Sequence, residues 1–430
     1  MLSADLLRRD PDAIRRSLER RREDASVVDE LVALDARRRD ALMQVEGLRS
    51  RRNEASKHIG ELMKRGGGPE ADARREEVRE LGERLGALEG EERELAESLR
   101  RLMLTLPNLV SDDVPDGDDA EGNVVAREEG ERRRYDFALK PHWELSESLG
   151  ITDFERGARV SGRMFYVLRE AGARLQRGLV QYMLDLHRER HGYVEWGVPF
   201  MVLGQTMENS SNLPKFADAL YRDAEEDLWL IPTAEVPLTS LHAGEILDAS
   251  ALPLRYMAHS PCFRRERAAA GSQVRGLKRV HQFEKVEMYQ FVEPAASMAA
   301  LDELVEHASD VARGLGLPFR VLQLCSGDLG FQSVKSYDIE IYAPGSDEWL
   351  EVSSCSNCTD FQSRRASIRL RRERGGRVEL AHTLNGSGLA LPRVMIALLE
   401  THQQPDGSVE LPEALAPYMG GQRTLRPAGG

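Results

Sequence analysis

The sequence predicts an α+β protein in which a helical hairpin precedes a domain built on an antiparallel β-sheet. Two observations support this fold class. A seven-residue repeat of apolar residues runs through the first hundred positions, and short apolar or alternating segments cluster after about residue 136 with few helices between them. No glycine-rich loop joins a strand to a helix, which argues against dinucleotide-binding and P-loop folds.

Length and composition indicate a globular protein of two or three domains, at roughly 150 residues per domain. The 430 residues include 72 acidic and 59 basic side chains, a net charge of −13, which excludes a broadly basic coat but not a local basic patch. Four cysteines are too few for a disulfide framework. No stretch approaches the roughly 18 apolar residues of a membrane helix. We therefore expect a cytoplasmic protein with no membrane or DNA partner.

Residues 1–110 are expected to form a helical arm, with an antiparallel coiled-coil hairpin over about 30–103. Apolar residues occupy eight of ten heptad positions over 31–62 and seven of eight over 78–102. Glycines and a proline place the tip at about 63–70. Each helix would extend about 48 Å at about 1.5 Å per residue. So narrow an arm cannot enclose a ligand, and we expect it to reach a partner or to dimerise.

Basic side chains gather toward the tip of this arm, and they are candidates for contact with phosphates. The candidates are Arg49, Arg52, Lys57, Lys64 and Arg65. The alternative interpretation is the ordinary solvated face of a charged coiled coil.

Residues 111–135 are acidic and glycine-rich, which predicts a linker, and residues 136–430 are expected to form the second domain. Helices are predicted over 172–191, 296–315 and 392–402. Strands are predicted over 228–231, 255–259, 284–291, 319–324, 336–342 and 349–353. Because few helices separate these strands, we expect the sheet to be antiparallel.

The segment 261–291 concentrates arginine and lysine on two predicted strands and the loop between them. Arginine binds phosphate oxygens bidentately, and Phe283 could stack on a nucleotide base. Glu266 and Glu287 could accept hydrogen bonds from amino groups. The alternative is a surface hairpin with alternating charges.

Glu340 and Glu351 lie on adjacent predicted strands. Paired carboxylates suit Mg²⁺ together with substrate phosphates, and a cross-strand ion pair is the alternative. Cys355 and Cys358 form a C-x-x-C pair, but a zinc site would need a second close pair.

Two weaker signals lie elsewhere in the second domain. The segment 385–388 is expected to form a glycine-bearing turn into an apolar helix, with Arg393 near the start of that helix. Thr233 is explained equally well as a helix cap and as a ligand-binding residue.

Taken in order, these motifs resemble those of bacterial seryl-tRNA synthetases, which are class II aminoacyl-tRNA synthetases, over essentially the whole chain. The three class II signatures would be the helix and strand that end at Pro199, residues 263–283, and residues 386–393. Segments typical of the seryl branch are 52–53, 56–60, 213–216, 231–239, 281–287, 351–357 and 383–388. Their joint order and spacing make the resemblance specific.

The resemblance implies a class II catalytic domain that acts as an ATP-dependent serine–tRNA ligase. Serine would react with ATP to give seryl adenylate and pyrophosphate. The terminal ribose of serine tRNA would then take the seryl group, with selenocysteine tRNA as a further candidate acceptor. The family also implies Mg²⁺, a homodimer, and an arm that contacts the long variable arm of serine tRNAs.

The resemblance also implies site residues, position by position. Catalytic roles would fall to Arg264, Glu287 and Arg393. The serine pocket would comprise Thr233, Ala234, Glu235, Arg264, Glu287 and Ser387. The ATP contacts would be Arg264, Arg265, Glu266, Val280, Phe283, Glu351, Val352, Ser353, Ser354 and Arg393. Arg264 would clamp the α-phosphate and the serine carboxylate, Arg393 would hold the γ-phosphate, and Glu351 and Ser354 would hold Mg²⁺.

One loop departs from the family pattern. Within 267–276, Ser-Gln-Val replaces the usual Arg-Asp-Thr. This loop is expected near ATP and the acceptor end, where it would affect the transfer rate and the tRNA preference. Two other functions are the alternatives: a paralogue that makes seryl adenylate for a non-tRNA acceptor, and a non-catalytic tRNA-binding protein. The arm argues against the first alternative. The presence of the expected ATP contacts argues against the second.

Overall fold

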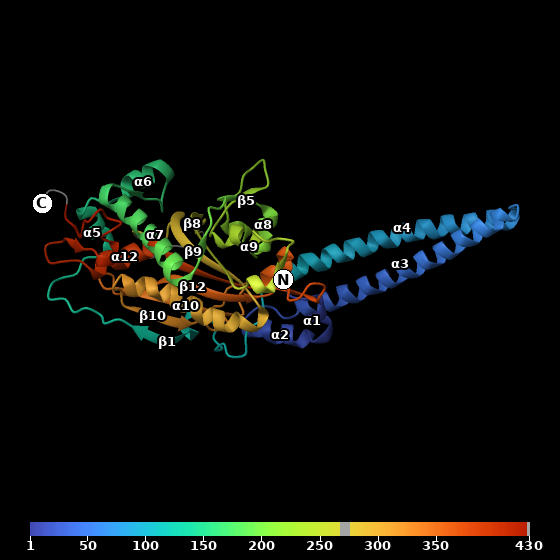
Figure 1. Ribbon diagram of the computed structural model, residues 1–430, viewed down its shortest axis with the longest axis horizontal. Coiled ribbons are helices and arrows are strands. Elements are labelled where there is room, and N and C mark those ends of the chain that lie inside the picture. The colour runs from blue at the N-terminus through green and yellow to red at the C-terminus, as the bar shows by residue number, and fades with distance from the viewer. Residues whose placement is uncertain (267–275, 428–430) are drawn as a thin grey trace. The chain divides into compact units, whose positions relative to one another are not determined.

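The computed structural model describes residues 1–266 and 276–427 (Figure 1). It confirms the α+β class, since two long helices precede a large and mainly antiparallel sheet. The chain divides into two compact units: one comprises residues 2–19 and 23–106, and the other comprises Met1, residues 20–22 and residues 107–430. Within the described ranges, every helix is too short or too polar to cross a membrane.

The first unit is dominated by a helical hairpin. Its helices are α1 (Ala4–Arg9), α2 (Pro11–Arg20, which ends in the other unit), α3 (Val27–Lys64) and α4 (Pro69–Leu104). Figure 1 shows α3 and α4 side by side and joined at the expected tip. Pro69 opens α4, where its missing N–H leaves no helical hydrogen bond unmade.

The heptad pattern explains how α3 and α4 pack. Val45 and Leu48 of α3 are buried against Leu81 and Leu85 of α4. Two of the polar exceptions in the heptads, Arg38 and Glu92, form an ion pair across the hairpin at 2.9 Å. The charges of these two residues therefore partly offset each other between α3 and α4.

The second unit is built on an eight-stranded sheet with the order β1-β10-β11-β12-β15-β9-β8-β4. Every neighbouring pair is antiparallel except β4 and β8. In sheet order the strands are Val124–Glu129, Phe319–Gln323, Lys335–Ala343, Glu348–Thr359, His382–Ala390, Gln282–Val292, Leu254–Phe263 and Val194–Glu195.

The three longest helices described in this unit pack on the sheet and form the main core with it. They are α7 (Glu170–His191), α10 (Ser297–Gly314) and α12 (Leu391–Thr401). Leu179, Leu304 and Leu398 from these helices are buried in one cluster with Met288 of β9 and Leu384 of β15. The predicted helices agree with these bounds to within two residues.

Shorter elements surround the sheet. The remaining helices are α5 (His142–Ser148), α6 (Phe154–Ser161), α8 (Gly204–Asn209), α9 (Glu235–Ser240) and α11 (Phe361–Ala366). The remaining strands are β2 (Thr152–Asp153), β3 (Val167–Leu168), β5 (Met201–Leu203), β6 (Leu228–Leu230), β7 (Ile246–Asp248), β13 (Arg369–Arg371), β14 (Val378–Leu380), β16 (Val409–Glu410) and β17 (Thr424–Leu425).

Two segments differ from the sequence expectation. Strand β1 lies inside the expected linker and forms one edge of the main sheet. Its residues are mostly exposed, so the strand depends on pairing with β10 rather than on a buried face. The expected turn at 385–388 is wrong, because these residues lie within β15 near the centre of the sheet.

The glycines of β15 serve packing rather than a turn. A Cβ on Gly386 would lie 3.0 Å from Cys355 Sγ, and a Cβ on Gly388 would lie 2.6 Å from His187 Nε2. Both distances are shorter than ordinary carbon contacts. Neighbouring groups can approach the strand this closely only because it lacks side chains at these positions.

Candidate active site

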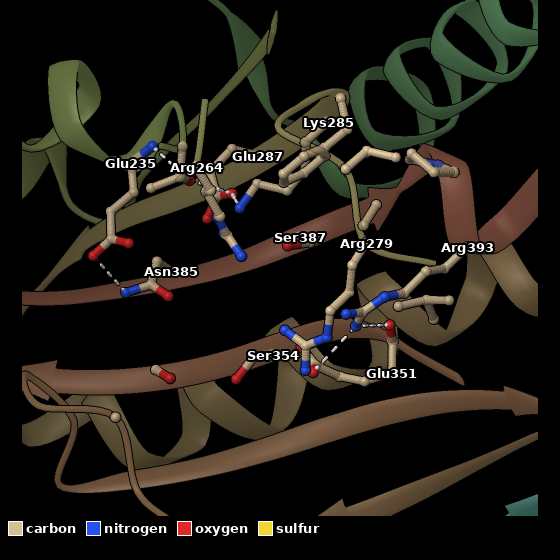
Figure 2. A pocket seen from close by; sticks show the side chains of 18 of the residues that line it. Glu235, Arg264, Arg279, Lys285, Glu287, Glu351, Ser354, Asn385, Ser387 and Arg393 are labelled. Carbon is tan, nitrogen blue, oxygen red and sulfur yellow. Dashed lines mark hydrogen bonds and ion pairs between the residues drawn. The ribbon is translucent and has the colours of Figure 1, made fainter. Parts of the chain in front are cut away.

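The motifs of the second unit meet around a cavity of about 330 Å³. Strands β9, β12 and β15, the segment 277–280 and the start of α12 all contribute to its wall. The sequence-predicted residues that line it are Thr233, Glu235, Arg264, Glu266, Val280, Phe283, Glu287, Glu351, Val352, Ser354, Ser387 and Arg393. Figure 2 shows Glu235 and Asn385 at one end of this cavity and Arg279, Glu351 and Arg393 at the other.

Glu235 forms the floor of the acidic end. Its Oε1 accepts hydrogen bonds from Gln362 Nε2 at 2.6 Å and from Asn385 Nδ2 at 3.0 Å. Burial, and then the neighbouring Glu287 carboxylate, raise the pKa of Glu235 to about 7. A cationic ligand group beside these two carboxylates would favour the ionised form of Glu235.

Glu287 is the second carboxylate at this end, and it is buried on β9. Its Oε2 accepts a hydrogen bond from Thr233 Oγ1 at 3.0 Å and forms an ion pair with Lys285. The carboxylate is therefore held in one orientation. Hydroxyl and amino groups of a small ligand are the groups that such a pocket can bind.

Arginines and an aromatic ring also line the cavity. The Arg264 guanidinium carbon lies 5.1 Å from the centroid of Phe283. The Arg279 guanidinium donates to Glu266 Oε2 at 3.1 Å, and Glu266 has a φ of +44°, a strained backbone for a residue other than glycine. These residues can bind an aromatic base and anionic oxygens together.

Arg393 lies in the first turn of α12, at the far end. It donates to the Glu351 backbone oxygen at 2.7 Å and to Glu351 Oε2 at 3.3 Å. It also donates to the Lys278 backbone oxygen at 3.5 Å. Arg393 therefore ties α12 both to β12 and to the segment that carries Arg279.

The oxygens near Glu351 suit a hard divalent cation. Ser354 lies on the same strand, and Asp338 pairs with Ser354 across β11 and β12. Burial, followed by the Glu351 carboxylate, raises the pKa of Asp338 well above its usual range. Asp338 Oδ1 is buried without a hydrogen-bond partner. Carboxylate and hydroxyl oxygens around such an orphaned atom are ligands that fit Mg²⁺.

Three sequence-predicted residues do not line the cavity. Ala234 is fully buried next to α9. Arg265 points elsewhere, with its guanidinium carbon 5.2 Å from the ring centroid of Tyr221. Ser353 donates its hydroxyl to the Ser387 backbone oxygen at 2.7 Å and so bonds within the sheet. The altered loop at 267–275 lies outside the described residues.

Several lining residues were missed from the sequence, and three of them follow the period of two along a strand. Lys285 lies on β9 between Phe283 and Glu287, both of which were predicted. Asn385 precedes Ser387 by two on β15, and Ser356 follows Ser354 by two on β12. Lys278 and Arg279 were noted in the basic segment without an assigned role.

Glu340, proposed with Glu351 as a carboxylate pair, pairs directly with it in strand register. However, Glu340 forms an ion pair with Arg320 at 2.6 Å and does not line the cavity. Cys355 and Cys358 are both buried as free thiols on β12. In the described part of the chain, no three or more His, Cys, Asp or Glu side chains are arranged to hold a metal.

The basic residues near the arm tip differ in their availability. Arg49 forms an ion pair with Glu89 across the hairpin at 2.7 Å. Lys57, Lys64 and Arg65 are exposed, and within the described ranges they have no ion-pair partner. Arg52 is half-buried.

Two family comparisons cover much of the chain. Residues 1–110 match the seryl-tRNA synthetase N-terminal domain. Residues 215–402 match the tRNA synthetase class II core domain of the G, H, P, S and T enzymes. The first match spans the helical arm, and the second spans most of the cavity-lining residues.

Curated relatives and solved structures extend this similarity to the whole chain. The serine–tRNA ligase of Thermomicrobium roseum is 53% identical over 99% of this chain and 95% of its own length. That of a Roseiflexus species is 54% identical over 99% of this chain and 100% of its own. The Pyrococcus horikoshii seryl-tRNA synthetase complexed with ATP superposes with a TM-score of 0.93, at 37% identity and full coverage of both chains. The cytoplasmic enzyme of Naegleria fowleri in complex with AMP gives a TM-score of 0.88 at 29% identity, covering 100% of this chain and 99% of that one.

Proposed function

The chain belongs to the seryl-tRNA synthetase family, and from this premise we propose that its central cavity activates serine with ATP and charges serine tRNA. The first step gives seryl adenylate and pyrophosphate. The second step passes the seryl group to the terminal ribose of the tRNA and releases AMP. The observation that best supports this proposal is that a single cavity has two buried carboxylates at one end and arginines along the rest of its wall.

The acidic end takes serine. Glu235 and Glu287 would pair with its ammonium group, and Thr233 and Ser387 would complete a small polar pocket. A polar pocket of this kind disfavours alanine, because an analogue that lacks the hydroxyl leaves buried polar groups unpaired. The serine carboxylate then faces Arg264, which approaches the same cavity from the end of β8.

The arginine-lined part takes ATP. Phe283 would stack on adenine, Glu266 would accept from its amino group, and Val280 would line the same site. Arg264 would hold the α-phosphate, and Arg393 the γ-phosphate. Val352 lines the same part of the wall.

Positioning and charge neutralisation account for the chemistry without a nucleophilic side chain. A serine carboxylate oxygen attacks the α-phosphorus, and pyrophosphate leaves. Arg264 would neutralise charge that develops on the α-phosphate while it holds the attacking carboxylate. Preorganised cations of this kind commonly contribute several kcal/mol of transition-state stabilisation.

We assign Mg²⁺ to the oxygens of Glu351 and Ser354, with Asp338 adjacent. When bound, the ion would neutralise phosphate charge. Because the described residues offer no complete protein cage, the remaining ligands would be substrate phosphates and water.

The remaining assignments concern the whole protein. We assign residues 1–110 to a tRNA-binding arm and residues 136–430 to catalysis, and the segment 111–135 between them adds the edge strand β1 to the sheet of the catalytic part. The arm would contact serine tRNA through Arg49, Arg52, Lys57, Lys64 and Arg65. We further propose a homodimer in the cytoplasm, where charged tRNA is used, with selenocysteine tRNA as a second candidate substrate.

The deciding experiment is ATP-dependent attachment of labelled serine to bulk tRNA, with alanine, threonine and cysteine as competitors. We expect serine alone to be attached. Adenylate formation without attachment would instead indicate a paralogue with another acceptor. Absence of both reactions, with folded protein and Mg²⁺ present, would reject the proposed function.

A further inference from the structure

A fully buried histidine outside the cavity connects α12 with the segment that carries Lys278 and Arg279. This residue is His142, the first residue of α5. Its Nδ1 lies 3.0 Å from Glu400 Oε1 near the end of α12. On the other side of the ring, the backbone N–H of Leu277 donates to His142 Nε2 at 3.2 Å.

These two bonds decide which ring nitrogen of His142 carries the hydrogen. Because the Leu277 amide is a donor, Nε2 must present its lone pair. Nδ1 therefore carries the hydrogen and donates a hydrogen bond to the Glu400 carboxylate. Glu400 also accepts from the backbone N–H groups of His142 and Ser346, at 2.8 Å and 2.9 Å, and from Ser346 Oγ at 2.7 Å. The carboxylate thus orients the imidazole, and the imidazole orients the Leu277 amide.

Leu277 begins the segment 277–280, all four residues of which line the cavity. Its side chain is buried in a cluster with Ile396 of α12. The next carbonyl, that of Lys278, accepts from Arg393 at the opposite end of the same helix. The segment is therefore fastened to α12 at two points, and His142 supplies one of them.

The chain approaches His142 at a position that only glycine suits. Gly276 has a φ of +73°, and a Cβ built on it would lie 2.1 Å from His142 Nε2. A side chain at this position would push the segment away from the imidazole. The backbone is therefore shaped to reach this histidine.

We propose that His142 is a positioning residue for ATP. Through its hydrogen bond to the Leu277 amide, it fixes the positions of Lys278, Arg279 and Val280 in the part of the cavity wall that would contact the nucleotide. The inference rests on the proposed function, since it assumes that this part of the cavity holds ATP. His142 itself touches no substrate. Its effect should appear in ATP binding and much less in serine binding.

Two substitutions test the two hydrogen bonds of His142 separately. His142→Gln places an amide oxygen close to where Nε2 was, so it can still accept from Leu277 while it gives up the Nδ1 donor. His142→Asn keeps a donor near Nδ1 and leaves the Leu277 amide unpaired. A third variant, Ser346→Ala, removes a different donor to Glu400 and leaves the histidine untouched.

Serine-dependent ATP–pyrophosphate exchange and thermal unfolding would be measured for all three variants. Loss of a single buried hydrogen bond should lower the unfolding midpoint in each of them. Only His142→Asn should raise KM for ATP, by about tenfold, with KM for serine changed less than about twofold. A purely structural role predicts instead that KM for ATP follows the unfolding midpoint across all three variants, and that result would overturn the proposal.

Gly276→Ala provides a second route if the asparagine variant fails to fold. It disturbs the same contact from the other side, so it should also raise KM for ATP while sparing KM for serine. An unchanged KM for ATP would overturn the inference alone, provided that the wild type catalyses the exchange. A folded wild type without serine-dependent exchange would overturn the proposed function, and this inference with it.

Discussion

Most charged side chains of the cavity are already paired with one another. Arg279 bonds to Glu266, Arg393 to Glu351, and Lys285 to Glu287. Such pairs hold each group in place before substrate arrives, and substrate oxygens must then compete for the cations. Arg264 differs, because within residues 1–266 and 276–427 it has no acidic partner within ion-pair distance and rests against Phe283. It is the cation most available to an incoming phosphate or carboxylate.

Because Arg264 is the cavity cation without an acidic partner in the described part of the chain, Arg264→Ala is the sharpest single-residue test of the cavity. We expect serine-dependent pyrophosphate exchange to fall by about 10²–10³, the usual effect of removing one preorganised charge from a transition state. The unfolding midpoint should stay close to that of the wild type. Arg222→Ala is a matched control, since this arginine also lies over an aromatic ring, Trp229, at 5.7 Å, but outside the cavity. Wild-type exchange in Arg264→Ala would refute the assigned role.

Glu235 gives a prediction on pH. Its pKa is raised to about 7 by burial and by Glu287, against a usual value of 4.5. Between these values the folded state binds more protons than the unfolded state, so its contribution to stability falls as pH rises. Relative to the non-titrating variant Glu235→Gln, the wild type should lose about 2–3 kcal/mol of unfolding free energy between pH 4.5 and 7. Urea unfolding of both proteins at several pH values measures this difference. If the unfolding free energies of the two proteins depended on pH in the same way, the raised pKa of Glu235 would be contradicted.

Among the secondary-structure elements, β15 needs its two glycines so that neighbouring helices can pack closely against it. The glycines of this segment predict a turn, because glycines commonly mark turns. In the folded chain they let α7 and α10 approach a central strand. That same strand presents Asn385 and Ser387 to the cavity. The packing of the helices and the placement of the serine pocket are therefore coupled.

Gly388→Ala should reveal this coupling. The added Cβ would lie 2.6 Å from His187 Nε2 and 3.3 Å from Val286 Cγ1, which are both buried. Overpacking of this kind should cost about 1–3 kcal/mol of stability and reduce exchange by displacing the adjacent Ser387. Gly86→Ala in α4 is the opposite case, because nothing lies within 4 Å of its added Cβ. It should stabilise the helix by about 1 kcal/mol. Chemical unfolding measures the change in unfolding free energy for both variants. Equal changes in Gly388→Ala and Gly86→Ala would contradict the conclusion that close packing requires glycine at position 388.

At the scale of the whole molecule, the two units allow the two steps of the reaction to be separated. Every residue of the cavity lies in the second unit, whereas the exposed lysines near the tip lie in the first. Activation requires only the small substrates. Charging also requires that a large tRNA be held in place.

Deletion of residues 36–98, with the helices rejoined by a short glycine–serine turn, should therefore spare pyrophosphate exchange and abolish charging of serine tRNA. Both reactions would be followed on the same preparation. A variant with Lys57, Lys64 and Arg65 changed to alanine keeps the arm and tests its charge alone. We expect it to weaken charging and to lower the dependence of tRNA binding on salt. Unchanged charging by the deletion variant would refute the role of the arm.

Elements whose signals are local could be predicted from the amino-acid sequence alone. Heptads specified α3 and α4, helical periodicity specified α7, α10 and α12, and the family resemblance implied about half of the cavity-lining residues between Thr233 and Arg393. Contacts between distant segments were decided only by the tertiary structure. Strand β1 exists because β10 pairs with it, β15 is a strand because β12 and β9 pair with it on either side, and His142 meets Leu277 and Glu400 across 135 and 258 residues of chain. The physical reason is that periodicity and propensity act over a few neighbouring residues, whereas a side chain acquires its partners only when the fold closes.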